Sequence, residues 1–308
     1  MNSAFWWSDW AYRDGIVSIK STGHQLPLRR KFLAVCMNWL IFYICMEVWR
    51  LAALRLRGPR IAFTPQRPRP WYFIWSCTHA VGGRIVRDQT KADLTIYFED
   101  TTASPPPPLP QSRAHMNFGC CDVSKSHVAR VFEQTFGYGI AVDPSIHAGP
   151  VVEKSEINGA HDGRVLQAPF TPKPDCAYQR LVDNRCGDNE VMDYRCVIVG
   201  RDMPLLFIKR RQIGKRFTNI NSDVRLVEPE EAFSETETAS LIEFAARMGL
   251  EWGAMDVLRD QMDGRLYVVD VNKTNIDPPI AMPLKDKLKA TSRVGKALKA
   301  FVASRAQG

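Results

Sequence analysis

The chain has 308 residues, of which 45% are hydrophobic and 24% are charged, a composition typical of a globular protein with two or three subdomains. Its net charge of +8 is concentrated at the ends, because residues 1–57 carry eight Lys and Arg against three Asp and Glu, and residues 285–308 carry seven against one. The middle is therefore slightly acidic, which argues against a nucleic-acid-binding protein, whose basic surface would extend across the folded domain. The eight cysteines show neither CxxC nor Cys/His ligand spacing, which argues against zinc and favours reduced thiols in a cytosolic protein.

The N-terminal segment, residues 1–57, contains an apolar run at residues 32–49, which only Asn38 and Glu47 interrupt. A membrane-spanning helix needs about 20 apolar residues, so the run lies at that threshold. We expect a hydrophobic helix that packs on the body of the protein or lies in a membrane interface, with a true span as the less favoured alternative. The run lies too far from Met1 for a signal peptide, and a misassigned start codon could account for part of the segment.

Residues 58–121 have the pattern of a small α/β unit. Short strands are predicted at residues 60–64, 84–86 and 94–98, with a helix at residues 71–81 that ends at Gly82 and Gly83. The proline run at residues 105–108, with Pro110 beyond it, predicts a stiff exposed loop that acts as a spacer.

A helix capped by Asp122 or Ser124 opens the next unit and ends at Gly137. A strand then leads to Lys154, and the loop after it contains Gly159 and Gly163. Glycines allow backbone N–H groups to turn toward phosphate oxygens, and lysine supplies a point charge, so this pattern is a weak indication of phosphate binding.

The closing part begins with a helix predicted over residues 229–249, where Ser234 and Glu237 form a capping box. Two strands follow at residues 254–259 and 266–271, joined by a turn at Asp263-Gly264. A basic amphipathic helix is predicted at residues 284–303; packing on the body is favoured over membrane contact.

Each of the two strands carries a carboxylate between apolar residues, Asp256 in the first and Asp270 in the second. Asn272 lies two residues beyond Asp270, so both side chains face the same side of the strand. Two carboxylates and an amide oxygen form a site suited to Mg²⁺, whereas the alternative is that both Asp residues cap turns at strand ends.

At this point the sequence resembles the ATP-grasp superfamily. MDVL followed by DGRLYVVDVN is similar to the end of an ATP-grasp domain, where an Asp on one strand and an acid-x-Asn on the next hold the magnesium of ATP. The usual acid is Glu, and Asp270 is a shorter ligand of the same chemistry. The resemblance implies an α/β (α+β) fold, with an ATP-grasp domain at residues 122–284 and its lid at about 150–212. The small α/β domain of residues 58–121 would precede it, and residues 285–308 would form a C-terminal helix.

The resemblance also assigns nucleotide-binding residues. Lys154 corresponds to the phosphate lysine, and Gly159 and Gly163 belong to the flexible phosphate loop. The residues that match the hinge, whose backbone pairs with the adenine edge, are Gln179, Arg180, Leu181 and Val182, and Asp183 is the candidate acceptor for the ribose.

Two cationic positions are implied to be catalytic. Asp193-Tyr194-Arg195 is similar to the family's D-x-R strand, in which Arg195 would hold phosphates or the acyl-phosphate; the alternative is an ion pair between Arg195 and Asp193. Among the cations of residues 209–211, we prefer Arg211 over Lys209 and Arg210 as the group that faces the triphosphate, with Lys209 as a further nucleotide contact. Asn221 is an additional metal or phosphate contact.

Two departures from the family pattern limit what can be carried over. Only twelve residues separate Val165 from Tyr178, where many members have a helix, so the lid should be smaller. Ser222-Asp223 replaces the Gly-Gly that often lies near the second substrate, so the resemblance does not give the substrate class.

We therefore predict a Mg-ATP-dependent ligase that activates a small-molecule or peptide carboxylate as an acyl-phosphate for attack by an amine or thiol. The predicted cofactors are ATP and Mg²⁺, with Mn²⁺ as a substitute, and no nucleic-acid partner is expected. The predicted location is cytoplasmic, with contact to a membrane surface through the N-terminal helix as an alternative. The rival functions are a kinase on the same fold and a non-catalytic, membrane-associated nucleotide-binding protein.

Overall fold

A small antiparallel sheet and a long helix form the N-terminal part of the fold. The computed structural model describes residues 10–13, 15–19, 25–27, 30–53, 58–112 and 114–306. Strands β1 (Trp10–Arg13), β2 (Ile16–Ile19) and β3 (Gln25–Pro27) pair in that order, and α1 covers Arg30–Ala53. The sequence analysis does not predict the short sheet, and residues 54–57, at the end of its N-terminal segment, lie outside the described residues.

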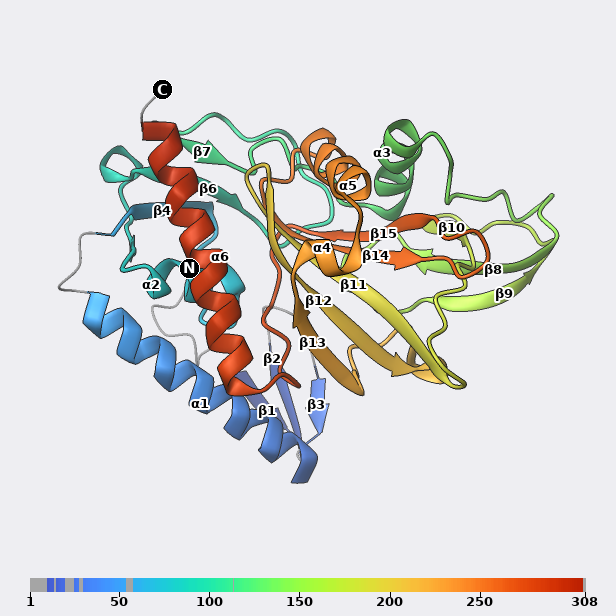
Figure 1. The fold of residues 1–308 in the computed structure, drawn as a ribbon, viewed down its shortest axis with the longest axis horizontal. Helices are drawn as coiled ribbons and strands as arrows, with labels where there is room; N and C mark the ends of the chain where they lie inside the picture. The colour runs from blue at the N-terminus through green and yellow to red at the C-terminus, as the bar shows by residue number, and fades with distance from the viewer. Residues whose placement is uncertain are drawn as a thin grey trace.

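Helix α1 lies along the outside of the molecule and contacts α2 and α6 (Figure 1). Its Phe42 and Met46 are buried against Trp75 of α2. Asn38 donates a hydrogen bond to the Ile280 carbonyl (3.2 Å) and accepts one from Lys287 Nζ (2.7 Å). No helix in the described part of the chain has the length and apolarity required to cross a membrane.

A parallel four-stranded sheet follows, in the strand order β5-β4-β6-β7. Its elements are β4 (Arg60–Pro65), α2 (Phe73–Ala80), β5 (Arg84–Ile85), a 3-10 turn (Gln89–Lys91), β6 (Leu94–Phe98) and β7 (His115–Met116). The predicted strand–helix–strand pattern is present, and β7 is an additional short strand at the edge.

Helix α3 (Lys125–Phe136) leads into an antiparallel three-stranded sheet of order β10-β8-β9. The strands are β8 (Gly149–Ser155), β9 (Arg164–Ala168) and β10 (Cys176–Arg180). Ser124 caps α3 by accepting a hydrogen bond from the His127 N–H, and Gly137 ends the helix at φ 75°. No helix lies between β9 and β10, as the short spacing predicts.

The largest sheet is antiparallel, with five strands in the order β13-β12-β11-β14-β15. The strands are β11 (Glu190–Val199), β12 (Asp202–Gln212), β13 (Asp223–Val227), β14 (Trp252–Arg259) and β15 (Leu266–Asn272), with a 3-10 turn (Ile213–Lys215) between β12 and β13. Strands β14 and β15 form the predicted pair.

The helix predicted over residues 229–249 is two helices, α4 (Pro229–Ala232) and α5 (Glu235–Arg247). They separate because Phe233 is extended (φ −132°, ψ 147°) and Ser234 starts a new helix. The predicted capping box of Ser234 and Glu237 is present, and Glu228 and Glu231 form a second one before α4. The C-terminal helix α6 covers Leu284–Ala306, three residues further than predicted.

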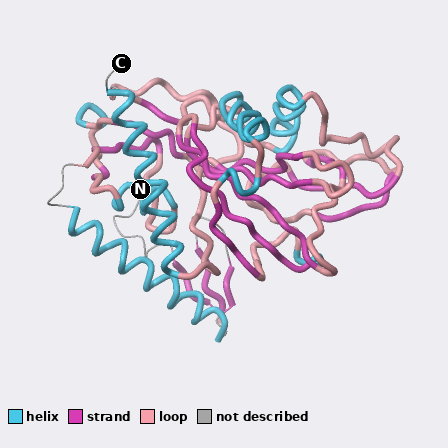
Figure 2. Tube along the Cα trace, in the orientation of Figure 1, coloured by secondary structure: helices cyan, strands magenta, loops and turns pink. Residues whose placement is uncertain are grey.

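Two apolar cores lie on opposite faces of the five-stranded sheet. On one face, Tyr194, Cys196 and Ile198 of β11 pack against α3 and α5. On the other face, Val197 and Val199 of the same strand pack against α2 and α6. Figure 2 shows the helices gathered at one end and along the upper edge, whereas the opposite end consists mainly of strands. The second face is therefore covered by helices over only part of its area, and its remainder carries the charged residues described below.

The small parallel sheet and the five-stranded sheet meet at Asn117, directly after β7. This asparagine is fully buried and adopts φ 65°, a conformation that Asn tolerates better than most residues. Its Oδ1 accepts hydrogen bonds from the backbone N–H groups of Glu251 (2.8 Å) and Trp252 (2.7 Å), and its Nδ2 donates to the Trp252 carbonyl (2.7 Å). Beside it, a Cβ on Gly249 would lie 2.4 Å from the Gly119 carbonyl carbon, so the backbones touch.

We predict that Asn117→Ala lowers the free energy of unfolding by about 3–5 kcal/mol, because it leaves two N–H groups and one carbonyl buried without partners. Urea unfolding followed by circular dichroism measures this change. Asn189→Ala, at an exposed asparagine, is the matched control and should change stability by less than about 0.5 kcal/mol. Equal stability of the two variants would show that Asn117 does not hold the junction.

Candidate active site

The two carboxylates predicted to bind metal lie directly opposite each other on neighbouring strands. Asp256 of β14 pairs with Asp270 of β15, and Ala254 pairs with Asn272. Residues directly opposite each other in an antiparallel pair place their side chains on the same face. Asp256, Asp270 and Asn272 therefore face the same side of the sheet, and the period of two had predicted this for Asp270 and Asn272.

Asp256 is held by two cations from neighbouring strands. Lys209 Nζ lies 3.0 Å from its Oδ1, and Arg195 Nη1 lies 3.2 Å from the same atom. Burial alone would raise the pKa of Asp256, but Lys209 and Arg195 outweigh it and hold that pKa well below its usual range. The carboxylate is therefore ionised at neutral pH.

Arg195 does not pair with Asp193, so that alternative is wrong. Its Nε lies 2.8 Å from Oδ2 of buried Asp277, which the sequence analysis does not select. Asp193 instead forms an ion pair with Arg211 at 2.8 Å. Lys209 lies directly opposite Asp193 on β12, and Arg211, two residues further on the same face, reaches Asp193 diagonally.

The three cations of β12 divide between the two faces of the sheet. Lys209 and Arg211 share the charged face, whereas Arg210, which lies between them, faces the other side. Arg211 also donates hydrogen bonds to the carbonyls of Arg216 and Thr218, both at 3.1 Å. Arg211 thus fixes the loop after β12, and Lys209 is the β12 cation that contacts the carboxylate pair.

Asp270 has a counterion from outside the sheet. Lys125, the first residue of α3, is buried, and its Nζ lies 2.7 Å from Asp270 Oδ1. The sequence analysis predicts the helix that Lys125 begins but assigns this lysine no role. The sequence shows that this lysine lies at the start of a capped helix. It does not show the partner of the lysine, because Asp270 is 145 residues away.

Lys154 enters the same charged region from β8, and its Nζ lies 3.5 Å from the Val269 carbonyl. Burial lowers the pKa of Lys154, the nearby Asp270 opposes this effect, and Lys125 adds to it. The structure thus brings Lys154, Lys209, Arg195 and the carboxylate pair together, as the resemblance implies.

Oxygen atoms suited to a divalent cation are present at this pair. Asn272 Oδ1 accepts hydrogen bonds from Thr274 N (2.9 Å) and Thr274 Oγ1 (3.4 Å), which fix the orientation of the amide. Among the described residues there is no group of three or more His, Cys, Asp or Glu side chains that could hold a metal. Two carboxylates and one amide oxygen therefore fit a cation such as Mg²⁺, which keeps several waters and takes other ligands from phosphates.

The predicted hinge lies at the end of β10. Gln179 is buried and its Nε2 has no hydrogen-bond partner among the described residues. Leu181 makes no backbone hydrogen bond within the described part, whereas the side chain of Val182 is packed in the core. Residues 140–142 already pair with Tyr178 and Arg180 along this edge, so the groups left for a base are the backbone of Leu181 and the Gln179 amide.

Two side chains of the hinge region already have partners. Arg180 donates to Tyr267 Oη (2.6 Å) and lies 3.3 Å from Asp260. Asp183 forms an ion pair with Arg185 at 2.5 Å. A ribose role for Asp183 would therefore require this pair to rearrange.

The glycine-containing loop after β8 contacts three other parts of the chain. The Asn158 N–H donates to Thr102 Oγ1 (2.8 Å), and Glu156 accepts from the Ser126 N–H at the start of α3 (3.1 Å). A Cβ on Gly163 would lie 2.6 Å from the Phe217 ring, so a larger residue there would require the ring to move, and Gly159 has φ 73°. The loop is thus placed between α3 and the loop after β12.

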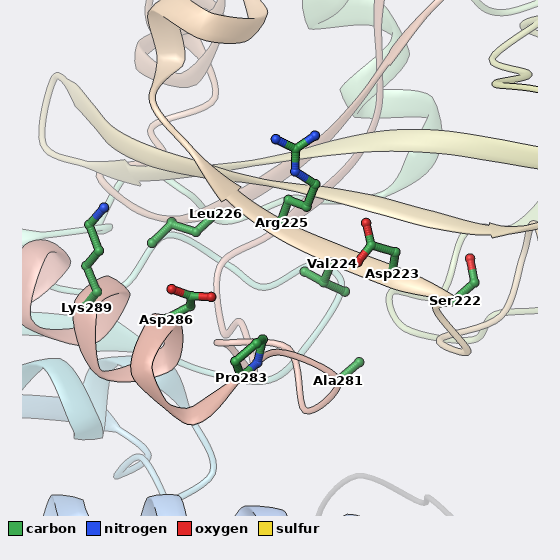
Figure 3. Close-up of a pocket in the computed structure, with 9 residues that line it drawn as sticks. All are labelled: Ser222, Asp223, Val224, Arg225, Leu226, Ala281, Pro283, Asp286 and Lys289. Atoms are coloured by element: carbon green, nitrogen blue, oxygen red, sulfur yellow. The ribbon is translucent and has the colours of Figure 1, made fainter.

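A pocket of about 420 Å³ lies elsewhere, between the edge strand β13 and the start of α6 (Figure 3). Charged side chains of both signs line it, among them Asp223, Arg225, Asp286 and Lys289. None of the residues predicted to bind nucleotide or metal lines this pocket, and β13 is at the opposite edge of the sheet from β15. The carboxylate pair with its cations is therefore the better candidate for catalysis.

The chain was compared with known proteins. No protein-family model matches the sequence, and no curated protein matches it either. Among solved structures, the ATP-grasp ligase PsnB complexed with a minimal precursor is similar at TM-score 0.50 and 12% identity, over 80% of this chain and 99% of that one. The same ligase complexed with a phosphomimetic variant of the precursor, Mg and ADP gives TM-score 0.51 and 11% identity, over 79% and 98%.

A RimK domain ATP-grasp protein from Sphaerobacter thermophilus is similar at TM-score 0.46 and 13% identity, over 79% of this chain and 99% of that one. At these identities, the likeness to the two PsnB structures concerns the fold, and it extends over almost the whole of PsnB. The chain has the ATP-grasp fold.

Proposed function

We propose that this protein is a Mg-ATP-dependent ligase that activates a carboxylate as an acyl-phosphate for attack by an amine or thiol. The observation that carries the proposal is the opposed pair Asp256 and Asp270, surrounded by Lys125, Lys154, Arg195 and Lys209. This arrangement suits phosphoryl transfer, where catalysis depends on positioning and on neutralising charge rather than on a protein nucleophile.

In this proposal each group has a distinct task. Asp256, Asp270 and Asn272 would hold Mg²⁺, which would supply positive charge to neutralise the phosphates of ATP. Lys154 and Lys209 would bind phosphate oxygens, and Arg195, fixed by Asp277, would stabilise the charge on the transferred group. Binding the phosphates requires Lys125 and Lys209 to share or leave the carboxylates that they contact here.

A site for the carboxylate substrate is proposed at the carboxyl edge of the small parallel sheet, where ligands of open α/β sheets commonly bind. A pocket of about 400 Å³ lies there, lined by Tyr97, Glu99, Ser104 and the proline run. Lys273, next to Asn272, is buried with its Nζ 5.5 Å from the centre of the Tyr97 ring. The pocket and the metal site would thus be connected through Tyr97 and Lys273.

PsnB was solved in complex with a minimal precursor, which favours a peptide as one substrate class to test.

Trapping with hydroxylamine tests the proposed reaction. The protein is incubated with ATP, Mg²⁺, hydroxylamine and a panel of Asp- and Glu-containing peptides and free amino acids. We expect ADP release coupled to hydroxamate formation with the correct acid, because hydroxylamine attacks an acyl-phosphate. Asp256→Asn should lower this rate by about 100-fold or more, since one of the two carboxylates proposed to hold Mg²⁺ loses its charge.

A phosphorylated product that survives hydroxylamine would instead favour the kinase. Absence of ATP turnover with the whole panel, in a protein that binds ATP, would favour the non-catalytic alternative. Circular dichroism of Asp256→Asn separates loss of activity from loss of folding.

The pH dependence of ATP affinity tests the role of Lys154. This lysine attracts phosphates only when it is protonated. Because its pKa is lowered, it loses its proton at a lower pH than an ordinary lysine, whose pKa is 10.5. Affinity for Mg-ATP should therefore fall as pH rises through that lowered pKa, because the ammonium loses its proton whereas the phosphates stay ionised. Lys154→Arg should keep its affinity over this range, because guanidinium remains protonated. Identical pH profiles for the two proteins would exclude Lys154 as the titrating group.

A further inference from the structure

The outer face of helix α1 is apolar and exposed. Six large apolar side chains on it are between 40% and 57% exposed, and we name them the outer stripe: Met37, Leu40, Ile41, Ile44, Val48 and Leu51. Contiguous apolar patches on a folded protein generally mark an interaction surface.

The spacing of the outer stripe is that of a helix–helix seam. From Met37 the exposed apolar positions continue at Ile41, Ile44, Val48 and Leu51, in steps of four, three, four and three. An average step of 3.5 keeps side chains along one line of a helix and is the repeat by which two helices pack along their lengths. The stripe extends over about 21 Å of helix, at 1.5 Å per residue.

The opposite face of α1 is already occupied. Phe42 and Met46 are buried against Trp75, and Asn38 is hydrogen-bonded to the Ile280 carbonyl and to Lys287. Turning the helix to bury the outer stripe would break these contacts. The outer stripe therefore stays exposed in the single chain, and a separate molecule would be needed to cover it.

The charge pattern of α1 favours a protein partner over a lipid surface. Helices that lie in a membrane interface carry a polar face rich in Lys and Arg. Residues 32–46 contain no charged residue on either face of α1, and Glu47 and Arg50 beyond them pair with each other at 2.6 Å. Helices that are hydrophobic on all sides are typically buried in a protein core or span a membrane, and no described helix of this chain is long and apolar enough for a span.

We propose that the outer stripe packs against the same stripe of a second copy of this chain, giving a homodimer with a two-fold axis at Ile44. Ile44 lies midway between Met37 and Leu51, so an antiparallel arrangement places Met37 opposite Leu51 of the partner subunit. Six half-exposed side chains on each copy bury roughly 1,000 Å² in total, which is the lower limit for a specific interface. Two-fold dimers are also the commonest assemblies of soluble proteins.

Sedimentation velocity of the full chain between about 1 and 100 μM tests the proposal. We expect a concentration-dependent monomer–dimer equilibrium for the wild type. Ile44→Glu and Ile44→Lys should each be monomeric, because two like charges would meet at the axis. An equimolar mixture of the two should dimerise again, because opposite charges would then face each other. Ile146→Glu, at an apolar residue that is 83% exposed in a loop, is the matched control and should dimerise like the wild type.

A wild type that stays monomeric at 100 μM, or an Ile44→Glu variant that still dimerises, would overturn the proposal. So would mixed Glu and Lys variants that remain monomeric. A monomeric wild type that sediments with vesicles of phosphatidylcholine and phosphatidylglycerol, and loses this binding in Ile44→Glu, would show that the stripe binds lipid. Circular dichroism checks that each variant is folded. The result does not depend on the proposed enzymatic activity.

Discussion

The opposed carboxylates Asp256 and Asp270 are the constraint on which the rest of the candidate site depends. Two like charges directly opposite each other on adjacent strands repel, and both are partly shielded from water. The structure offsets this repulsion with cations from three other elements: Lys209 from β12, Arg195 from β11 and Lys125 from α3. Removing one partner of a buried pair typically costs about 3–5 kcal/mol, so these ion pairs fix the position of α3 relative to the sheet. In the proposed function the same oxygens would hold a divalent cation, which links the stability of this part of the sheet to its chemistry.

The five-stranded sheet can hold this charged cluster because one of its faces is divided. Near one end of β11, Val197 and Val199 join the apolar core formed with α2 and α6. On the same face of the strand, Asp193 and Arg195 belong to the charged cluster. Lys154 reaches that cluster from the three-stranded sheet, which has a small apolar cluster of its own. The division lets one rigid sheet support both packing and a polar site, and it places the site next to the junction with the small parallel sheet.

The local parts of this arrangement could be predicted from the sequence. The period of two was sufficient to place Asp270 and Asn272 on one face, and the predicted capping box of Ser234 and Glu237 is present, at the start of α5. Partners that lie far apart in the sequence could not be predicted in this way. Asp277 is 82 residues from Arg195, and Lys125 is 145 residues from Asp270. Both pairs depend on how the sheets and helices pack, which no local pattern reports. The break between α4 and α5 was missed for a different reason, since Phe233 fits a helical apolar face but adopts an extended backbone.

The most direct test of the account is calorimetric titration of ATP into the protein with and without Mg²⁺, for the wild type and for Asp270→Asn. The asparagine keeps the shape of the side chain and removes its charge. The account predicts that Mg²⁺ strengthens ATP binding to the wild type and that the variant loses this increment while it still binds ATP without metal. A wild type that does not bind ATP, or a variant in which Mg²⁺ strengthens binding as much as in the wild type, would contradict the assignment of the carboxylate pair as the metal and nucleotide site.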